Sequence, residues 1–189
     1  MAVTTTVNGI DVEALGQTIE AIKGDPGIAR FTFRANTEWE NGTTSRAEIH
    51  SFNHAGDDVA HKKTHTLVGC EPEVLVGKDS GPNAVELALA SLGFCYSVGF
   101  VANAAAKGYE LEEMSYEVEG DLDLRNFVGI EDGPRPGFTE IRVTGRAKAR
   151  NASAQELQEL CRYVQDTSPV KDILANSVPI KTSLEVVEA

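Results

Sequence analysis

The sequence predicts an α+β fold, because strand-like and helix-like stretches are grouped along the chain and do not alternate one for one. Residues 28–39, 113–124 and 138–149 alternate polar and apolar side chains with the period of two that is typical of half-buried strands. Residues 84–107 and 154–166 have helical spacing instead. We therefore expect antiparallel sheets packed around a buried central helix.

Length and composition indicate one soluble globular domain covering residues 1–189. The chain is 41% apolar and 24% charged, which is ordinary for a folded protein. Its 29 acidic and 17 basic residues give a formal charge of −12, and this charge repels phosphate backbones and anionic lipid surfaces. The sequence thus predicts no nucleic-acid partner and no membrane partner.

The first residues resemble a helical extension more than a targeting segment. Val12, Leu15, Ile19 and Ile22 have the spacing of a short amphipathic helix, and no basic start or continuous apolar run precedes them. We assign residues 1–27 to an N-terminal helical extension and expect a cytoplasmic protein. Three widely spaced cysteines, an odd number, also suit a reducing compartment.

The first half of the chain is expected to begin as a meander of strands. Residues 28–39 form the first predicted strand, and Asn41-Gly42 is a strong hairpin signal. Residues 44–52 should return antiparallel, and residues 62–70 add a third strand.

The stretch from Ala84 to about Lys107 is apolar or small on nearly every side, which is typical of a buried helix. Asn83 and Glu86 have the spacing of a capping box, and Gly108 is a natural stop. The run is long enough to span a membrane, but its Ser, Gly and Asn residues and its capping signals favour a core helix.

The second half is expected to contain two strands, a helix pair and a last strand. The strands at 113–124 and 138–149 flank a Gly- and Pro-rich loop. Ser153 and Glu156 form a second capping box before the helix at 154–166. Ser168-Pro169 then suits the start of a short helix, and residues 178–187 read as a closing strand.

Cys95 is the main candidate for chemistry, and two interpretations of it remain open. It belongs to a stripe of mostly small residues at every fourth position of the central helix, which favours close packing in which the thiol is inert. The alternative is a reactive thiol, which would need stabilisation from elsewhere because Cys95 lies three turns inside its own helix. A helix beginning at Ser168-Pro169 could supply it. The members of the stripe are Leu87, Ser91, Cys95, Gly99 and Asn103.

Three segments together resemble the OsmC/Ohr family of osmotically inducible and organic hydroperoxide resistance proteins. They are the hairpin "W..G", the helix opening "GPNAVELALASLGFC" and the motif "SPV", in this order between residues 28 and 187. The resemblance implies an intertwined homodimer with its active sites at the subunit interface. It also implies that Cys95 is a peroxidatic cysteine that reduces organic hydroperoxides, with no cofactor.

One departure from the family pattern concerns the second cysteine of the peroxidases, because Ser168 stands at its position before "PV". Cys161 lies seven residues earlier, about 10 Å along a helix, which is too far for a disulfide. The resemblance therefore implies a one-cysteine peroxidase that needs an external thiol reductant. The alternative is a non-catalytic member that binds a small apolar or thiol ligand at the same interface.

The resemblance further implies an arginine near the first hairpin, held by a glutamate, that stabilises the thiolate. Glu73 fits the glutamate, whereas the hairpin tip "EWENG" has no arginine. Arg46 is the preferred replacement and Arg34 the other, although either could be an ordinary surface arginine. We also expect the Ser168 hydroxyl and the neighbouring amides to contact the Cys95 sulfur.

The other thiols and the histidines are expected to be structural. Cys70 has no cation beside it in sequence and reads as a core or sheet-edge thiol. The four histidines fall in predicted strands and turns without a matching cysteine or carboxylate, so no metal site is predicted. They are His50, His54, His61 and His65.

Overall fold

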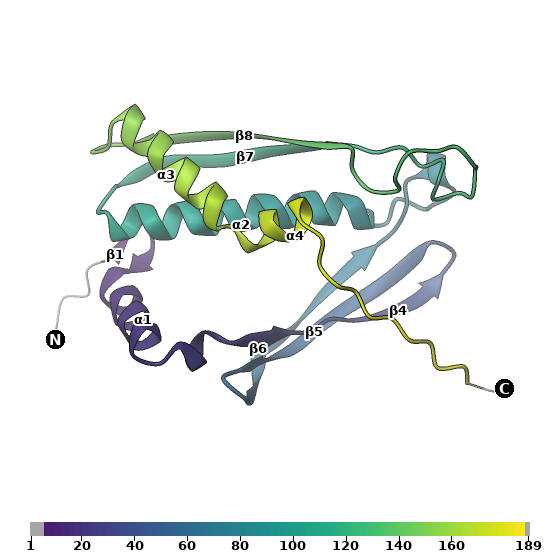
Figure 1. The fold of residues 1–189 in the computed structure, drawn as a ribbon, viewed down its shortest axis with the longest axis horizontal. Helices are drawn as coiled ribbons and strands as arrows, with labels where there is room; N and C mark the ends of the chain where they lie inside the picture. The colour runs from purple at the N-terminus through teal and green to yellow at the C-terminus, as the bar shows by residue number, and fades with distance from the viewer. Residues whose placement is uncertain (1–5, 188–189) are drawn as a thin grey trace.

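The computed structural model describes residues 6–187, and within them antiparallel strands and helices form the predicted α+β fold (Figure 1). The first half contains β1 (Thr6–Val7), β2 (Ile10–Asp11), α1 (Val12–Gly24), η1 (Pro26–Ala29), β3 (Phe31–Phe33), β4 (Asn36–Asn41), β5 (Thr44–His54), β6 (Asp57–Gly69) and η2 (Glu73–Leu75). The second half contains α2 (Ala84–Ala106), β7 (Leu111–Asp121), β8 (Glu140–Ala149), α3 (Ala154–Thr167) and α4 (Pro169–Ala175).

The N-terminal sheet is built around the long strand β5. On one side β5 pairs with β3 and β4 in succession, and on the other side it pairs with β6, in each case antiparallel. The predicted strand at 28–39 is thus split into η1, β3 and β4, because the backbone leaves the ladder at Arg34 and Ala35. The hairpin at Asn41-Gly42 is present, as predicted, with Asn41 paired to Thr44.

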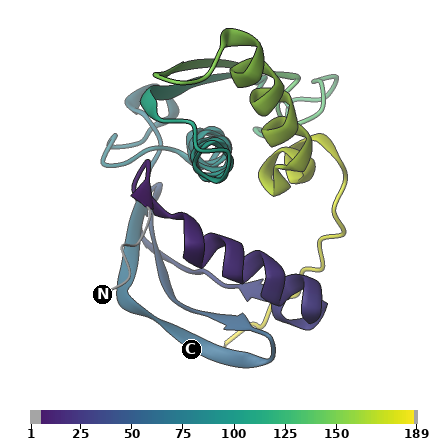
Figure 2. The same cartoon turned by 90° about the vertical axis from the view of Figure 1, so that its left-hand side faces the viewer.

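The second layer consists of β7 and β8, which pair over almost their full lengths, with α2 and α3 packed on them (Figure 1). Seen from the end, α2 lies between this layer and the N-terminal sheet (Figure 2). The core is formed by one face of α2 and one face of α3. It comprises Leu92, Tyr96, Phe100, Ala104, Leu160 and Val164.

Both predicted capping boxes are confirmed at the helix starts. The Asn83 side chain accepts from the Glu86 amide at 2.9 Å, and the Glu86 carboxylate accepts from the Asn83 amide at 2.9 Å. Ser153 and Glu156 make the same exchange at the start of α3. Each box pairs two amides that a helix start would otherwise leave without a partner.

Residues 1–5 of the predicted helical extension lie outside the described residues, and within the rest β1 and β2 precede the helix α1. Asp11 caps α1, and its side chain accepts from the Ala14 amide at 3.0 Å. Asn8 ties the chain before this helix to the second layer. Its side chain donates to the Tyr109 carbonyl and accepts from the Leu111 amide, both at 2.9 Å. These bonds fix the N-terminal segment at the beginning of β7.

Within the described chain one structural expectation is wrong, and another is met on one face only. Residues 178–187 form no strand and are exposed, because they pair with no strand of the described chain. The central helix is not buried all round. Its face with Leu92, Tyr96 and Phe100 is buried, whereas Phe94 and Val98 are 72% and 70% exposed.

Helix α2 is also the one helix among residues 6–187 that is long and apolar enough to cross a membrane. Length and composition alone also fit the core helix of a soluble protein. The buried face of α2 packs on β7 and α3, which is the packing of a core helix.

Candidate functional site

Cys95 lies on α2 where this helix meets the junction between α3 and α4. The Cys95 Sγ is 3.1 Å from the Ser168 Oγ, so the expected contact between these two side chains is present. Cys95 is partly buried, whereas Ser168 is only 6% exposed. The two residues are 73 positions apart in sequence, and the fold brings them together.

Ser168 makes a second hydrogen bond besides this contact. Its hydroxyl oxygen accepts from the Lys171 amide at 3.1 Å and thereby caps the start of α4. The bond from Lys171 leaves the hydroxyl with its own proton and one free lone pair, so either atom of the contact with a Cys95 thiol can be the donor. Towards a thiolate the hydroxyl can only donate. The site therefore offers Cys95 a neutral hydrogen-bonding partner.

The amides expected at the sulfur are not there. Within residues 6–187 the Ser168 hydroxyl is the only hydrogen-bonding partner of the Cys95 Sγ. Pro169 has no amide proton, and the Lys171 amide binds the serine hydroxyl and not the sulfur. The helix start therefore acts on Cys95 through Ser168.

Gly99 allows the close approach that places α3 and α4 over Cys95. A Cβ at this position would lie 3.0 Å from the Val164 Cγ1, so a larger residue would push α3 away. The stripe of small residues on α2 is thus a packing surface, which agrees with the interpretation that these residues serve close packing. The Cys95 thiol lies within this surface. Packing and chemistry are compatible here.

Arg46 and Glu73 do not meet in the chain. The Arg46 Nε donates to the Glu40 Oε1 at 2.5 Å, across the β4–β5 hairpin. Glu73 is exposed at the start of η2, and no ion pair between it and an arginine is found in the described residues. The register pairs Arg46 with Glu38, and the irregularity between Trp39 and Asn41 leaves Glu40 within reach of Arg46. The family resemblance had implied Glu73 as the partner. Neither Arg46 nor Glu73 contacts Cys95 within one chain.

Cys70 is a second unusual thiol, which the sequence analysis treated as ordinary packing. It is 3% exposed, and its Sγ lies 3.3 Å from the Thr44 hydroxyl and 3.6 Å from the Thr43 hydroxyl. The Ser80 hydroxyl, the Thr44 hydroxyl and the amides of Ser80 and Lys78 lower the pKa of Cys70 to about 5, and burial opposes this shift. Hydroxyls and amides achieve this without any cation, which is why a search for neighbouring charges missed it.

Cys161 is on α3, and its sulfur accepts from the Gln165 side chain at 3.3 Å. None of the three cysteines forms a disulfide. His61 and His65 have ring centroids 5.0 Å apart, but among the residues that the structure describes no group of three or more His, Cys, Asp or Glu side chains gathers in a way that could hold a metal ion.

Comparisons with known proteins agree on the fold. A family model described as "OsmC-like protein" matches residues 77–183. An OsmC-like protein from Mycoplasma pneumoniae shares 16% identity over 76% of this chain and 87% of its own, with a TM-score of 0.56. An OsmC-like protein of unknown function from Vibrio cholerae shares 12% identity over 74% of this chain and 91% of its own, with a TM-score of 0.55.

No match to a curated protein was found. The family model covers more than half of the chain, including α2 with Cys95 and the α3–α4 junction with Ser168. It leaves out the N-terminal sheet and α1. The chain therefore belongs to the OsmC-like family.

Proposed function

We propose that this protein reduces organic hydroperoxides through Cys95 and depends on an external thiol to restore it. The observation that carries this proposal is the 3.1 Å contact between the Cys95 Sγ and the Ser168 hydroxyl. A thiolate is the reactive form of cysteine, and the Ser168 hydroxyl is placed to donate to it. The family likeness and the placement of Cys95 on the central helix support the same activity.

The proposed reaction has three steps. The Cys95 thiolate attacks the outer peroxide oxygen, so an S–O bond forms, the O–O bond breaks, and the alkoxide leaves as an alcohol after taking up a proton. Cys95 is then a sulfenic acid. An external thiol displaces water from it to give a mixed disulfide, and a second thiol releases Cys95 as a thiolate and leaves as the oxidised disulfide.

Ser168 explains the requirement for an external thiol. A serine cannot form a disulfide with the sulfenic acid, and Cys70 and Cys161 form no disulfide with Cys95 in the structure. The hydroxyl instead offers the sulfur a hydrogen bond before reaction. We expect activity in the cytoplasm, where thiol reductants are abundant.

We further propose that two copies of the chain form an intertwined dimer with Cys95 at the interface. Large apolar side chains are exposed on the face of α2 beside Cys95 and on the N-terminal sheet, which is unusual for a monomer. Phe33 and Trp39 are 75% and 72% exposed. The C-terminal segment leaves Ile180 and Leu184 88% and 87% exposed. A second copy would cover these residues, and light scattering after size-exclusion chromatography should give twice the chain mass.

The roles of Arg46 and Glu73 in stabilising the thiolate by charge depend on this proposed dimer. Within one chain Arg46 pairs with Glu40, so a hairpin arginine could act on a thiol only in the neighbouring copy. If so, Arg46→Ala should slow peroxide reduction in the dimer without changing the dimer mass. An unchanged rate would remove Arg46 from the site.

The direct test is a thiol titration with cumene hydroperoxide, followed by trapping of sulfenic acid with dimedone and mass spectrometry. We expect one thiol lost per chain, with the adduct on Cys95. Cys70→Ser and Cys161→Ser should retain the reaction, whereas Cys95→Ser should lose it. Absence of any adduct at Cys95 in the folded protein would overturn the proposal.

The second candidate function is a non-catalytic member that binds a small apolar or thiol ligand at the same interface. The observation that favours it is again Ser168, since the site holds no second sulfur. The titration separates the two functions. The binding function would be supported if the protein does not react with hydroperoxide and an apolar ligand raises its Tm. Cys95→Trp should then abolish the increase in Tm.

A further inference from the structure

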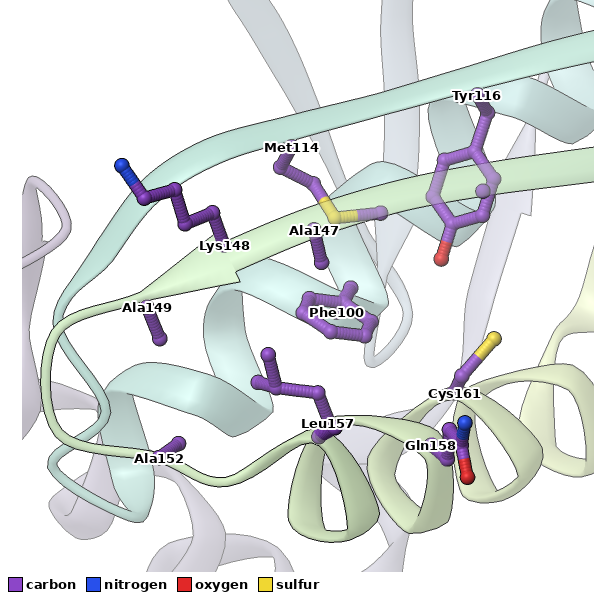
Figure 3. Close-up of a pocket in the computed structure, with 12 residues that line it drawn as sticks. Phe100, Met114, Tyr116, Ala147, Lys148, Ala149, Ala152, Leu157, Gln158 and Cys161 are labelled. Atoms are coloured by element: carbon purple, nitrogen blue, oxygen red, sulfur yellow. The ribbon is translucent and has the colours of Figure 1, made fainter.

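A separate hollow lies between α3 and the sheet formed by β7 and β8 (Figure 3). Its volume is about 420 Å³, which is within the range of small-molecule pockets. Phe100 forms part of its wall from α2, Met114 from β7 and Leu157 from α3. These side chains make the pocket mainly apolar.

The hollow exists because β8 presents only small residues to α3. Gly145, Ala147 and Ala149 alternate along the strand and all line the pocket. Ala152 and Ala154 continue this small-residue lining at the start of α3. A helix packed on a sheet face usually meets larger apolar side chains, so these positions leave space that the core does not fill.

One polar group in this pocket has no partner. The Tyr116 hydroxyl is buried and makes no hydrogen bond to any described residue. In Figure 3 the ring of Tyr116 extends from β7 and carries its hydroxyl towards the side of α3 that bears Cys161. Burial, and then the nearby Cys161 through its charge and a side-chain interaction, raise the pKa of Tyr116, so the hydroxyl stays neutral and keeps its proton. The distance and angle between the hydroxyl and the Cys161 sulfur do not reach those of a hydrogen bond.

The opposite strand is shaped to accept this ring. Tyr116 pairs with Gly145 across the sheet, and a Cβ on Gly145 would lie 2.8 Å from the Tyr116 Cε1. A glycine is therefore needed for the ring to lie as it does. Buried hydroxyls are normally hydrogen-bonded, so the unpartnered Tyr116 hydroxyl indicates that an acceptor is missing from the pocket.

The charges around the pocket limit what can bind. The lining residues within the described chain include no carboxylate, and their one cation, Lys148, pairs with the Glu112 Oε2 at 2.7 Å. The sulfur of Cys161 already accepts from Gln165. An ion would have no free counter-charge here, which excludes charged ligands.

We propose that this pocket binds a small, neutral, mainly apolar molecule whose single hydrogen-bond acceptor takes the proton of the Tyr116 hydroxyl. The pocket is distinct from the Cys95 site. Phe100 follows Cys95 by five residues, about 7.5 Å along the helix axis. The proposal does not depend on peroxide reduction, and a protein without that activity would still show the binding.

The test uses two probes of nearly equal shape. Acetophenone has a carbonyl acceptor, and α-methylstyrene has a methylene group in its place. The chain has two methionines, Met1 and Met114, so methyl-labelled methionine gives a simple NMR spectrum in which Met114→Leu assigns the pocket signal. We expect saturable shifts of the Met114 methyl signal with both probes.

The contribution of the Tyr116 hydrogen bond to binding is measured by the ratio of the dissociation constants of acetophenone and α-methylstyrene. Tyr116→Phe should change this ratio by about 3- to 10-fold in favour of α-methylstyrene, the effect of one neutral hydrogen bond. Tyr109→Phe is the matched control, because its hydroxyl binds Glu156 outside this pocket. It should leave the ratio unchanged.

A second variant tests the location. Ala147 is exposed to the hollow, so Ala147→Leu can fill space without displacing the core and should weaken both probes. Three results would each overturn the proposal. They are a Met114 signal that does not saturate in the wild type, binding that is unaffected by Ala147→Leu, and a ratio that is unaffected by Tyr116→Phe.

Discussion

Ser168→Ala is the most informative single change in this protein, because it removes one hydroxyl that takes part in two hydrogen bonds. The hydroxyl caps α4 through the Lys171 amide and makes the 3.1 Å contact with the Cys95 sulfur. Loss of a serine cap costs about 1 kcal/mol of unfolding free energy, which corresponds to about 3 °C in Tm for a chain of this size. We therefore expect Ser168→Ala to fold with a slightly lower Tm.

The effect on Cys95 is expected to be larger than the effect on stability. When the hydroxyl donates to the attacking thiolate, this hydrogen bond to a charged group contributes about 1.5–3 kcal/mol, which corresponds to about 10- to 100-fold in rate. A thiolate without the hydrogen bond is a better nucleophile, which offsets nearly half of this effect on a logarithmic scale. The second-order rate with hydroperoxide should fall by about 3- to 10-fold.

The control for this prediction is Ser153→Ala, because Ser153 caps α3 in the same way and contacts no sulfur. Stopped-flow measurement of thiol loss with cumene hydroperoxide, run beside thermal denaturation, separates the two effects. Both variants should lose a similar amount of Tm, and only Ser168→Ala should react more slowly. Equal rates in the two variants would refute a role of Ser168 at the sulfur.

Three further predictions concern the same thiols and the buried tyrosine. Ser168→Cys should form a disulfide with Cys95 on peroxide treatment, visible by non-reducing mass spectrometry. The difference in unfolding free energy between wild type and Cys70→Ala should increase as pH rises from about 5 to 9. The reason is that the pKa of Cys70 is lowered in the folded state, so the stabilising contribution of its thiolate is lost below about 5. Chemical denaturation at several pH values measures this slope, and a flat difference would contradict it. Tyr116→Phe should raise the free energy of unfolding by about 1 kcal/mol, because it removes a buried hydroxyl without a partner, and a lower Tm would argue against that assignment.

Local signals in the sequence predicted the elements near the site well. The pairs Asn83–Glu86 and Ser153–Glu156 each act within four residues, so sequence spacing alone defines them. Ser168-Pro169 likewise marks the start of α4. The small residues on α2 predicted a close packing surface, whereas the contact between Cys95 and Ser168 was expected from the resemblance to the OsmC/Ohr family.

Contacts that depend on register or on a second chain were not predictable in this way. Arg46 pairs with Glu40 because of the irregularity in the hairpin register, which no spacing rule predicts. Cys70 gathers donors from two segments, Thr43-Thr44 and Lys78–Ser80, that meet only in the folded chain. Residues 178–187 have the alternation of a strand, but alternation does not supply the partner edge that a strand needs.

The identity of residue 168 links stability and chemistry at one atom. A hydroxyl oxygen is a strong acceptor for the Lys171 amide, whereas a thiol sulfur is a weak one, so a cysteine at this position would cap α4 poorly. The hydroxyl, in turn, is held 3.1 Å from the Cys95 sulfur because the cap fixes the serine rotamer. A serine here therefore gives a well-capped helix and a hydrogen-bonding partner for Cys95, and we propose that it leaves reduction of an oxidised Cys95 to an external thiol. A cysteine would exchange the cap for an internal disulfide, so one position decides between the two ways of recycling the site.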